Sequence, residues 1–405
     1  MKRIVLFVIA VLMLSSCADR KDKPVLMMCS PRPSGIGQEY VSEKSIQKEQ
    51  KYEALNYNRV KAVWVSYLEL APIIGNGEDT FRKEFDKICK NCCDIGFNTV
   101  FAHVRTFSDS FYPSEYYGQS KAFNGKSFDA LSCMVEIAHS YKLSFHAWIN
   151  PLRCETKQYI NTVSEGTLIG KWLSDPKSYD EYVVYVEKTG HYWLNPAVTE
   201  IRQLIADGVA EIVRGYDVDG IHIDDYFYPT NEPFFDSGIY IEQNVDKSLS
   251  EWRTENCSEM VSQLYRAVKE ENSLVEFGIA PQGNIENNYY YLFADVKRWC
   301  SEDGFCDYIV PQIYFGYNNK YKPYSETLKV WSEMCSRSNK KLVIGIGAYK
   351  IMTEDEFIYD KGIVVRQAAD ALDLCDGAAM FSYNSFFGND RAEEERARLK
   401  EFYLK

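Results

Sequence analysis

The stretch Asp219-Gly220-Ile221-His222-Ile223-Asp224-Asp225-Tyr226 decides the fold, because it has the pattern of a short apolar strand that ends in two carboxylates. Side chains alternate along a strand, so Ile221 and Ile223 are expected on one face and His222 and Asp224 on the other. In a closed barrel the first pair faces the surrounding helices and the second pair faces the interior. The pattern therefore predicts a barrel strand that holds Asp224 at the mouth.

Seven similar apolar runs flank this stretch and alternate with longer segments of helical period, which is the pattern of β–α–β units. The predicted strands are residues 62–67, 99–105, 144–150, 220–225, 276–281, 308–314, 342–349 and 377–383. The predicted helices are residues 80–95, 127–141, 196–216, 248–272, 290–301, 325–338, 361–374 and 390–403. Pro196 suits the first turn of the third helix. Eight alternations predict an α/β fold of the (β/α)₈ TIM barrel class.

Length and composition fit one barrel of this kind. The chain has 405 residues, of which 46% are hydrophobic and 26% are charged, as in soluble globular proteins. Such barrels often exceed about 250 residues as one unit once loops are inserted, so no second domain is required. The formal net charge of −12 disfavours long-range attraction to nucleic acid or to an anionic membrane surface. No nucleic-acid partner is expected.

The N-terminus predicts export. Two basic residues precede a short apolar run that ends in Leu14-Ser15-Ser16-Cys17, which resembles the bacterial lipobox. Residues 1–17 are therefore predicted to be a lipoprotein signal peptide and Cys17 the lipidated residue; an ordinary signal peptide with a chance cysteine is the alternative. Polar residues 18–56 predict a flexible tether, which leaves 57–405 for the barrel. We expect a bacterial cell-envelope protein that faces the periplasm or the exterior and contacts a membrane only through this lipid.

Polar and aromatic side chains stand near the carboxyl ends of the predicted strands, where active sites of TIM barrels lie. The residues predicted to bind substrate are His103, Arg105, His146, Trp148, Asn150, His222, Gln282, Gln312, Tyr314, Tyr349 and Asn384. Aromatic residues make up 15% of the chain, which suits stacking against sugar faces, although an aromatic core is an equal explanation. For a single member such as His103, a hydrogen-bonded structural role is as consistent as substrate contact.

Carboxylates are the catalytic candidates, because glycoside hydrolysis uses two carboxyl groups that flank the bond. Asp224 at the mouth is expected to act on the anomeric carbon, directly as nucleophile or through a water as general base. Asp225 should point away unless the strand bends, and a cap on backbone N–H groups is its alternative role. The acid that protonates the leaving oxygen is then sought in loops, at Asp109, Glu115 or Glu286.

Short sequence motifs are distributed in order along the whole barrel region. They are Ala62-Val63-Trp64-Val65-Ser66, Gly96-Phe97-Asn98-Thr99-Val100-Phe101, His103-Val104-Arg105, Tyr112-Pro113-Ser114, His146-Ala147-Trp148-Ile149-Asn150-Pro151, Trp193-Leu194-Asn195-Pro196, residues 219–229, Pro311-Gln312-Ile313-Tyr314 and Gly345-Ile346-Gly347-Ala348-Tyr349-Lys350. In these blocks the chain resembles the glycosyl hydrolase-like 10 family, from about residue 58 to the C-terminus.

The resemblance implies hydrolysis of a polysaccharide, in some relatives of peptidoglycan strands stripped of their stem peptides, with Asp224 matching the catalytic carboxylate. The chain departs from the family after the fifth strand, where an aromatic and basic stretch is replaced by Gln282-Gly283-Asn284-Ile285-Glu286-Asn287-Asn288. The resemblance therefore does not carry over the identity of the sugar or the position of the acid.

Two other functions compete with glycoside hydrolysis. A non-catalytic glycan-binding envelope lipoprotein is favoured if no acidic partner lies within about 10 Å of Asp224. A deacetylase would need a metal or a Ser–His pair, and no motif of either kind is present. Cys89, Cys92 and Cys93 lack a second ligand pair at zinc spacing, so we expect no metal and no other cofactor.

Overall fold

The computed structural model describes residues 52–405, except for the side chains of residues 177 and 179. Eight parallel strands close into a barrel in the order β1-β13-β12-β11-β10-β9-β5-β2. The barrel strands are β1 (Val60–Val65), β2 (Thr99–Arg105), β5 (Ser144–Ile149), β9 (Gly220–Ile223), β10 (Glu276–Ile279), β11 (Tyr308–Ile309), β12 (Lys341–Gly347) and β13 (Gly377–Phe381). Each predicted strand is present, so the predicted TIM barrel is confirmed.

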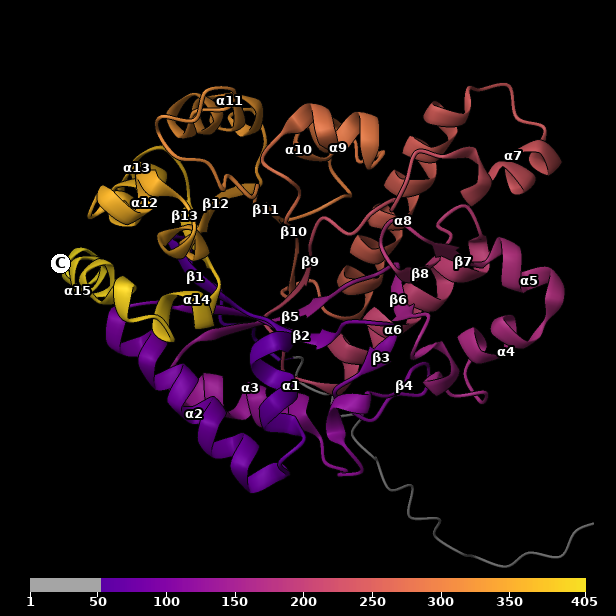
Figure 1. Cartoon of the computed structure of the whole chain (residues 1–405), viewed down its shortest axis with the longest axis horizontal. Coiled ribbons are helices and arrows are strands. Elements are labelled where there is room, and N and C mark those ends of the chain that lie inside the picture. The colour runs from indigo at the N-terminus through magenta and orange to yellow at the C-terminus, as the bar shows by residue number, and fades with distance from the viewer. Residues whose placement is uncertain (1–51) are drawn as a thin grey trace, which may run out of the picture. The chain divides into compact units, whose positions relative to one another are not determined.

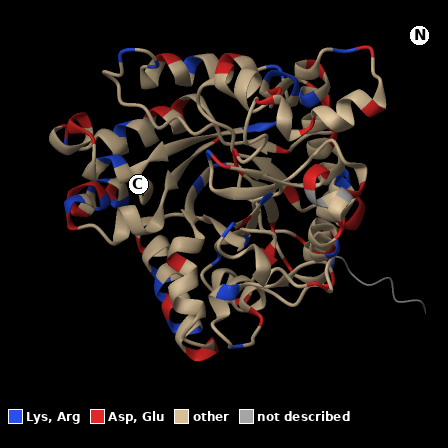
Figure 2. Ribbon diagram, turned by 45° about the vertical axis from the view of Figure 1, so that its right-hand side comes forward, with Lys and Arg blue, Asp and Glu red and all other residues tan. Residues whose placement is uncertain are grey.

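Helices surround the strands (Figure 1). The helices that follow the eight strands are α2 (Glu78–Ile95), α3 (Ala130–Ser140), α6 (Thr199–Gly215), α8 (Leu249–Glu271), α10 (Val296–Ser301), α11 (Tyr324–Cys335), α13 (Ile363–Leu374) and α15 (Glu393–Tyr403). The third helix starts later than predicted, because the Asn195 side chain accepts a hydrogen bond from the Ala197 N–H at 3.0 Å and holds Pro196 in a turn. Figure 2 shows the charged residues mainly on these helices and on the loops.

Shorter elements lie in the loops and were not predicted. The short helices are α1 (Tyr67–Ile74), α4 (Leu168–Ser174), α5 (Pro176–Glu181), α7 (Ser237–Gln243), α9 (Ile285–Tyr291), α12 (Asp355–Tyr359) and α14 (Tyr383–Phe387). The short strands are β3 (Asp109–Ser110), β4 (Gly118–Gln119), β6 (Arg153–Thr156), β7 (Val183–Val186) and β8 (His191–Leu194). The last three form an antiparallel sheet after β5, in the order β6-β8-β7. This sheet brings Arg153 to the mouth of the barrel, where it pairs in register with Trp193.

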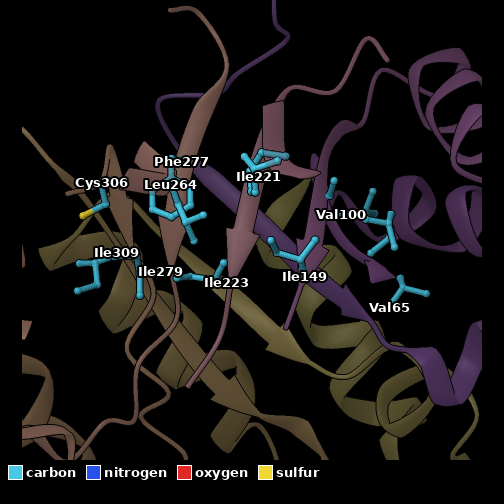
Figure 3. Close-up of a cluster of buried hydrophobic side chains, with 14 of the residues drawn as sticks. Val65, Val100, Ile149, Ile221, Ile223, Leu264, Phe277, Ile279, Cys306 and Ile309 are labelled. Carbon is cyan, nitrogen blue, oxygen red and sulfur yellow. The ribbon is translucent and has the colours of Figure 1, made fainter. Parts of the chain in front are cut away.

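Two layers of buried side chains lie on opposite faces of the barrel wall. Ile221 and Ile223 pack in the outer layer against the helices, and Figure 3 shows them beside Phe277 and Ile279 of the neighbouring strand. The ring of His222 instead faces the interior and stacks on Phe101, with 4.2 Å between the ring centroids. The predicted alternation along β9 is therefore confirmed.

Asp219 anchors the amino-terminal end of the barrel. Its carboxylate accepts hydrogen bonds from the Tyr52 hydroxyl at 2.7 Å, the Leu55 N–H at 2.5 Å and the Phe145 N–H at 2.7 Å, and it lies 2.8 Å from Nε2 of His139. Tyr52 and Leu55 belong to the predicted tether, so the tether does not extend to residue 56. Cys17, the signal peptide and residues 18–51 lie outside the described residues.

Gly220 is required at its position by a close approach of a side chain. A Cβ atom there would lie 2.2 Å from Nδ1 of His146, far inside van der Waals contact. The Asp-Gly pair at the start of β9 therefore has two structural roles. Asp219 forms hydrogen bonds at the base of the barrel, and Gly220 leaves room for the His146 ring inside it.

Among residues 52–405, no helix is long and apolar enough to cross a membrane.

We predict that Asp219→Ala lowers the free energy of unfolding by about 3 kcal/mol, because several buried donors lose their acceptor. Denaturant-induced unfolding of the purified protein measures this change. Asp217→Ala is the matched control, since Asp217 is exposed and its loss should cost less than about 0.5 kcal/mol. Equal stability of the two variants would contradict this account of the barrel base.

Candidate active site

A pocket of about 480 Å³ opens at the carboxyl ends of the barrel strands. The residues that line it are Trp64, Ser66, Tyr67, Leu68, His103, Trp148, Arg153, Asp224, Asp225, Tyr226, Gln312, Tyr314, Tyr349 and Phe381. Its walls are largely aromatic, and its only carboxylates among the described residues belong to Asp224 and Asp225. Seven residues proposed from the sequence meet here, namely His103, Trp148, Asp224, Asp225, Gln312, Tyr314 and Tyr349.

Both aspartates reach the pocket because β9 ends at Ile223, before the pair begins. The alternation of a strand no longer applies to them, so Asp225 does not point away from Asp224 as a continued strand would require. Asp224 is 4% exposed, and its Oδ1 accepts a hydrogen bond of 3.4 Å from the Tyr226 N–H. The chain end of β9 thus supplies two adjacent carboxyl groups to one cavity.

The Asn150 amide lies between Asp224 and Arg153. With its nitrogen directed at Asp224, it donates to the two carboxylate oxygens at 3.0 and 3.1 Å, and its oxygen accepts from Nη2 of Arg153 at 2.5 Å. In this orientation the amide donates to a carboxylate and accepts from a guanidinium group. Asn150 therefore touches Asp224 rather than lining the pocket itself.

Asp225 is held from the other side by two amides. Nε2 of Gln282 donates to Oδ2 of Asp225 at 3.1 Å, and Nε2 of Gln312 donates to Oδ1 at 3.1 Å. Gln312 also donates to the Ala280 carbonyl at 2.9 Å, which fixes its side chain. Two side-chain amides are thus partners of this carboxylate.

The two environments affect the carboxyl groups differently. Burial, and then the neighbouring charge of Asp225, raise the pKa of Asp224 well above its ordinary value, while Arg153 opposes the rise. Burial also raises the pKa of Asp225, but the hydrogen bonds from Gln282 and Gln312 stabilise its charged form and oppose the rise. Asp224 is therefore the member of the pair that more readily keeps a proton.

His103 forms part of the pocket wall in its neutral state. Its ring stacks on Trp148, with 3.3 Å between the centroids, and its Nδ1 accepts a hydrogen bond of 3.1 Å from the Tyr67 N–H. Burial, and then the charge of Arg153, hold the pKa of His103 well below its ordinary value. The ring supports Trp148 and is not a cation at neutral pH.

His146 and His222 lie below the pocket, in the interior of the barrel, and do not reach the mouth as the sequence analysis expected. Trp64 Nε1 donates to His222 Nε2 at 3.0 Å, so His222 carries its proton on Nδ1 and donates to the Tyr308 hydroxyl at 3.0 Å. Tyr308 in turn donates to His146 Nδ1 at 2.7 Å, and His146 Nε2 lies 3.0 Å from Oγ of Ser144. Burial lowers the pKa of His146 to about 3 and that of His222 well below its ordinary value.

Arg105 and Asn384 also lie away from the pocket. A register shift between His103 and Arg105 turns the arginine outward, where it stacks 4.2 Å from the ring centroid of Tyr117. Asn384 lies in α14 and borders a separate hollow, and its N–H donates to Oε1 of Glu69 at 3.1 Å. Both expected contacts with substrate are therefore replaced by contacts within the protein.

The three loop acids do not face Asp224. Asp109 closes a turn by accepting from the Phe107 N–H at 2.9 Å, and the Glu115 side chain is exposed beside α6, where its N–H donates to Glu211 at 2.6 Å. Glu286 is exposed on α9 and pairs with Lys322 at 2.7 Å. None of them lines the pocket. The second carboxyl group of the site is thus Asp225.

The chain matches the sequence model described as Glycosyl hydrolase-like 10 over residues 59–360. It belongs to the glycosyl hydrolase-like 10 family. It is 31% identical over 296 residues to "Glycosyl hydrolase YngK" of Bacillus subtilis (strain 168), covering 67% of this chain and 56% of the relative. It is 27% identical over 432 aligned residues to "Glycosyl hydrolase DigH" of Escherichia coli (strain K12), covering 100% of this chain and 96% of the relative. The chain thus spans just over half the length of the first relative and nearly all of the second.

Solved structures share the barrel at low sequence identity. The glycoside hydrolase domain of PgaB (BpsB) from Bordetella bronchiseptica superimposes with a TM-score of 0.59 at 11% identity, covering 84% of this chain and 98% of that domain. A β-galactosidase from Rahnella sp. R3 gives a TM-score of 0.59 at 11% identity, covering 88% and 57% respectively. These likenesses establish the fold, and membership of the family establishes a glycoside hydrolase-like protein.

Several pocket residues of this family member were missed from the sequence. Arg153, Tyr226, Tyr67 and Trp64 all line the cavity. Trp64 stands one residue before the end of β1 and Tyr226 three residues after the end of β9, both within quoted blocks, so their positions carried a usable signal. Arg153 follows the Asn150-Pro151 motif by only two residues, but the short sheet that carries it was not predicted. Within residues 52–405, no three His, Cys, Asp or Glu side chains gather in a way that could hold a metal ion.

We predict that Tyr308→Phe costs about 2 kcal/mol of stability, because His146 and His222 both lose their shared hydroxyl partner. Denaturant unfolding checks the loss, and Tyr290→Phe is the control because Tyr290 is 62% exposed. If both variants unfold at the same denaturant concentration as the wild type, the interior hydrogen bonds are not the stabilising feature described here.

Proposed function

We propose that this protein hydrolyses glycosidic bonds in a polysaccharide, with Asp224 and Asp225 as its two carboxyl groups. The observation that carries the proposal is the joint exposure of this pair to one aromatic-walled pocket at the barrel mouth. Acid-assisted cleavage of a glycosidic bond requires two carboxyl groups with different pKa values. The other loop acids considered from the sequence are engaged elsewhere.

Asp224 is assigned as the general acid. It is the more buried aspartate and the one whose pKa is held well above its ordinary value, so it retains a proton to deliver to the leaving oxygen. This assignment exchanges the roles expected from the sequence, where Asp224 acted on the anomeric carbon. The reason for the exchange is its burial beside the charge of Asp225.

Asp225 is assigned to the anomeric carbon. Its charged form is supported by the Gln282 and Gln312 amides, which also fix the direction of its two oxygens. A fixed carboxylate in this position stabilises the positive charge that develops in the oxocarbenium-like transition state, directly or through a water. The glutamines act through Asp225 and are positioning residues.

Aromatic rings form the remaining walls and are suited to the apolar faces of sugars. Tyr314 packs edge-on against Tyr349, with 5.8 Å between the centroids, and lies 5.6 Å from Phe381. Trp64 and Trp148 border the same cavity. The rings are held by one another, so a sugar that enters meets surfaces that are already in place.

The cell envelope is part of this proposal. A lipid on Cys17 and a tether over residues 18–51 would hold the barrel at a bacterial membrane, and peptidoglycan strands are the glycan at hand there. The support is the lipobox-like sequence Leu14-Ser15-Ser16-Cys17 and the resemblance to the family. Radiolabelled palmitate incorporation by the wild type and by Cys17→Ala tests the lipid.

We predict that Asp224→Asn lowers kcat on peptide-free peptidoglycan glycan, or on another polysaccharide that the wild type cleaves, by about 1,000-fold or more. Asp225→Asn should cause a loss of similar size, because both changes keep the shape of the side chain, while the first removes the acidic proton of Asp224 and the second removes the negative charge of Asp225. Release of oligosaccharides, followed by mass spectrometry, gives the rates. Glu115→Gln and Glu286→Gln serve as matched controls and should stay within about twofold of the wild type.

The same experiment separates hydrolysis from a purely binding function. A glycan-binding lipoprotein without catalysis would retain glycan under all conditions and release no product, and the aspartate variants would then change affinity only. Wild-type turnover by Asp224→Asn on a proven substrate would refute the assignment of Asp224.

The pH profile should be bell-shaped, because the acid must be protonated while its partner is ionised. The raised pKa of Asp224 extends activity upward in pH, and the rate falls as rising pH removes its proton. On the acid side, the rate falls as Asp225 gains a proton. Gln312→Leu removes a donor that lowers the pKa of Asp225, so the acid limb should move to higher pH while the alkaline limb moves less.

A further inference from the structure

Two buried cysteine side chains meet between helices that cover one side of the barrel. Cys300 lies near the end of α10, and Cys335 is the last residue of α11. The Sγ of Cys335 donates a hydrogen bond of 3.3 Å to the Sγ of Cys300. The two residues are 5% and 0% exposed, so each thiol faces the other inside the protein. Bonded sulfur atoms lie about 2.0 Å apart, so a modest approach of the two side chains would join them.

Other cysteines near this pair have different contacts. The Sγ of Cys306 donates a hydrogen bond of 3.7 Å to the Trp299 carbonyl. Cys306 and Cys375 lie near enough for the charge of a Cys335 thiolate to raise their pKa values. They are therefore rival partners for Cys335, but the direct contact between two thiols favours Cys300.

The pair encloses a segment that the barrel holds through short pairings. β11 lies between the two cysteines and, with two residues, is the shortest of the eight barrel strands. It pairs with each neighbouring strand through these two residues. Gln312 and Tyr314, which line the pocket, follow β11 within the enclosed segment. A covalent bond between Cys300 and Cys335 would therefore join the two helices that flank this part of the barrel.

A tryptophan connects α11 with the candidate active site. Trp331 lies one turn before Cys335, and its Nε1 donates to the Gly283 carbonyl at 2.9 Å. Gly283 directly follows Gln282, whose amide donates to the Asp225 carboxylate. The position of α11 is thus linked to a residue that holds one of the two carboxyl groups.

The protonation of the thiols bears on when they can react. The hydrogen bond from Cys335, and then burial, raise the pKa of the Cys300 thiol above its ordinary value, while the charge of Lys340 opposes the rise. Thiol–disulfide exchange requires a thiolate that its partner can reach. The buried pair should therefore react while the chain folds and should resist reduction once the helices are packed.

We infer that Cys300 and Cys335 form a disulfide bond that joins α10 to α11 in the exported protein. The oxidant is a protein disulfide of the cell envelope: one thiolate attacks it, and the second thiolate releases the oxidant from the mixed disulfide. One S–S bond forms and one breaks, and two protons and two electrons pass to the oxidant, which leaves as a dithiol. This inference goes beyond the proposed function and takes from it only the oxidising envelope.

The pairing is tested on wild-type protein from its own cells. The cells are quenched with acid, free thiols are blocked with N-ethylmaleimide, and the purified protein is digested without reduction for mass spectrometry. We expect the peptides that carry Cys300 and Cys335 to be linked and to separate after treatment with dithiothreitol. Blocked thiols at both positions, or a link from either cysteine to Cys306 or Cys375, would overturn the inference.

A second measurement determines the effect of the bond on stability. The purified protein is unfolded and reduced, and then refolded either with oxidised glutathione or with dithiothreitol. We expect the Tm of the oxidised form to be about 5 °C higher, because the cross-link restricts the unfolded chain. The comparison is made within each variant, so a general loss of stability does not obscure it.

Serine variants identify the cysteines responsible. Cys300→Ser and Cys335→Ser should each abolish the difference in Tm between the two refolding conditions. Cys306→Ser should keep the difference, as should the matched control Cys257→Ser, which changes a buried cysteine of α8.

The remaining outcomes are equally decisive. Equal Tm values for the two wild-type forms, or a difference that persists in Cys300→Ser and Cys335→Ser, would overturn the inference. A disulfide that forms on refolding but is absent from the protein isolated from cells would overturn it as well. None of these results depends on Asp224 or Asp225, so the hydrolase function is tested separately.

Discussion

The rest of the structure depends on one constraint, which is that the interior of this barrel is polar and every ring nitrogen there needs a partner. The column Trp64, His222, Tyr308 and His146 meets the constraint with a single orientation of its protons, because Trp64 can only donate. Burial keeps both histidines neutral, so no counter-charge is required below the pocket. The charged groups at the barrel mouth therefore lie above an interior that is neutral and fully hydrogen-bonded.

These interior residues also fix the geometry of the site. His222 is the last inward residue of β9, and Asp224 follows it by two positions, so the place of the histidine ring sets the height at which the strand ends. Trp64 is both the top of the column and part of the pocket wall. A displacement at the base of the barrel would consequently move the Trp64 ring, against which a sugar would pack. The stability of the interior is therefore linked to the shape of the cavity.

The barrel could be predicted from the sequence because each strand has a local apolar pattern. The alternation of side chains alone placed Ile221, Ile223 and His222 correctly. It failed where position depends on where a strand stops or slips. Asp225 enters the pocket because β9 ends one residue before Asp224, and Arg105 leaves the mouth because of a register shift after His103. Such features depend on pairing with neighbouring strands, and a single strand's sequence does not contain that information. His146 was misplaced for a related reason, since inward-facing residues occupy several layers and only the uppermost meets solvent.

The loop after β5 completes the site in a way that the barrel alone does not. Parallel strands bring aromatic rings and aspartates to the mouth, yet the cation among them comes from the small antiparallel sheet that begins at Arg153. A positive group beside two carboxyl groups opposes the rise in their pKa values, and too strong a contact would deprive the acid of its proton. Asn150 lies between Arg153 and Asp224, with one end of its amide on each, so a neutral group separates the guanidinium from the carboxyl group. The interposed amide allows one small pocket to contain both a carboxyl group with a raised pKa and a guanidinium group.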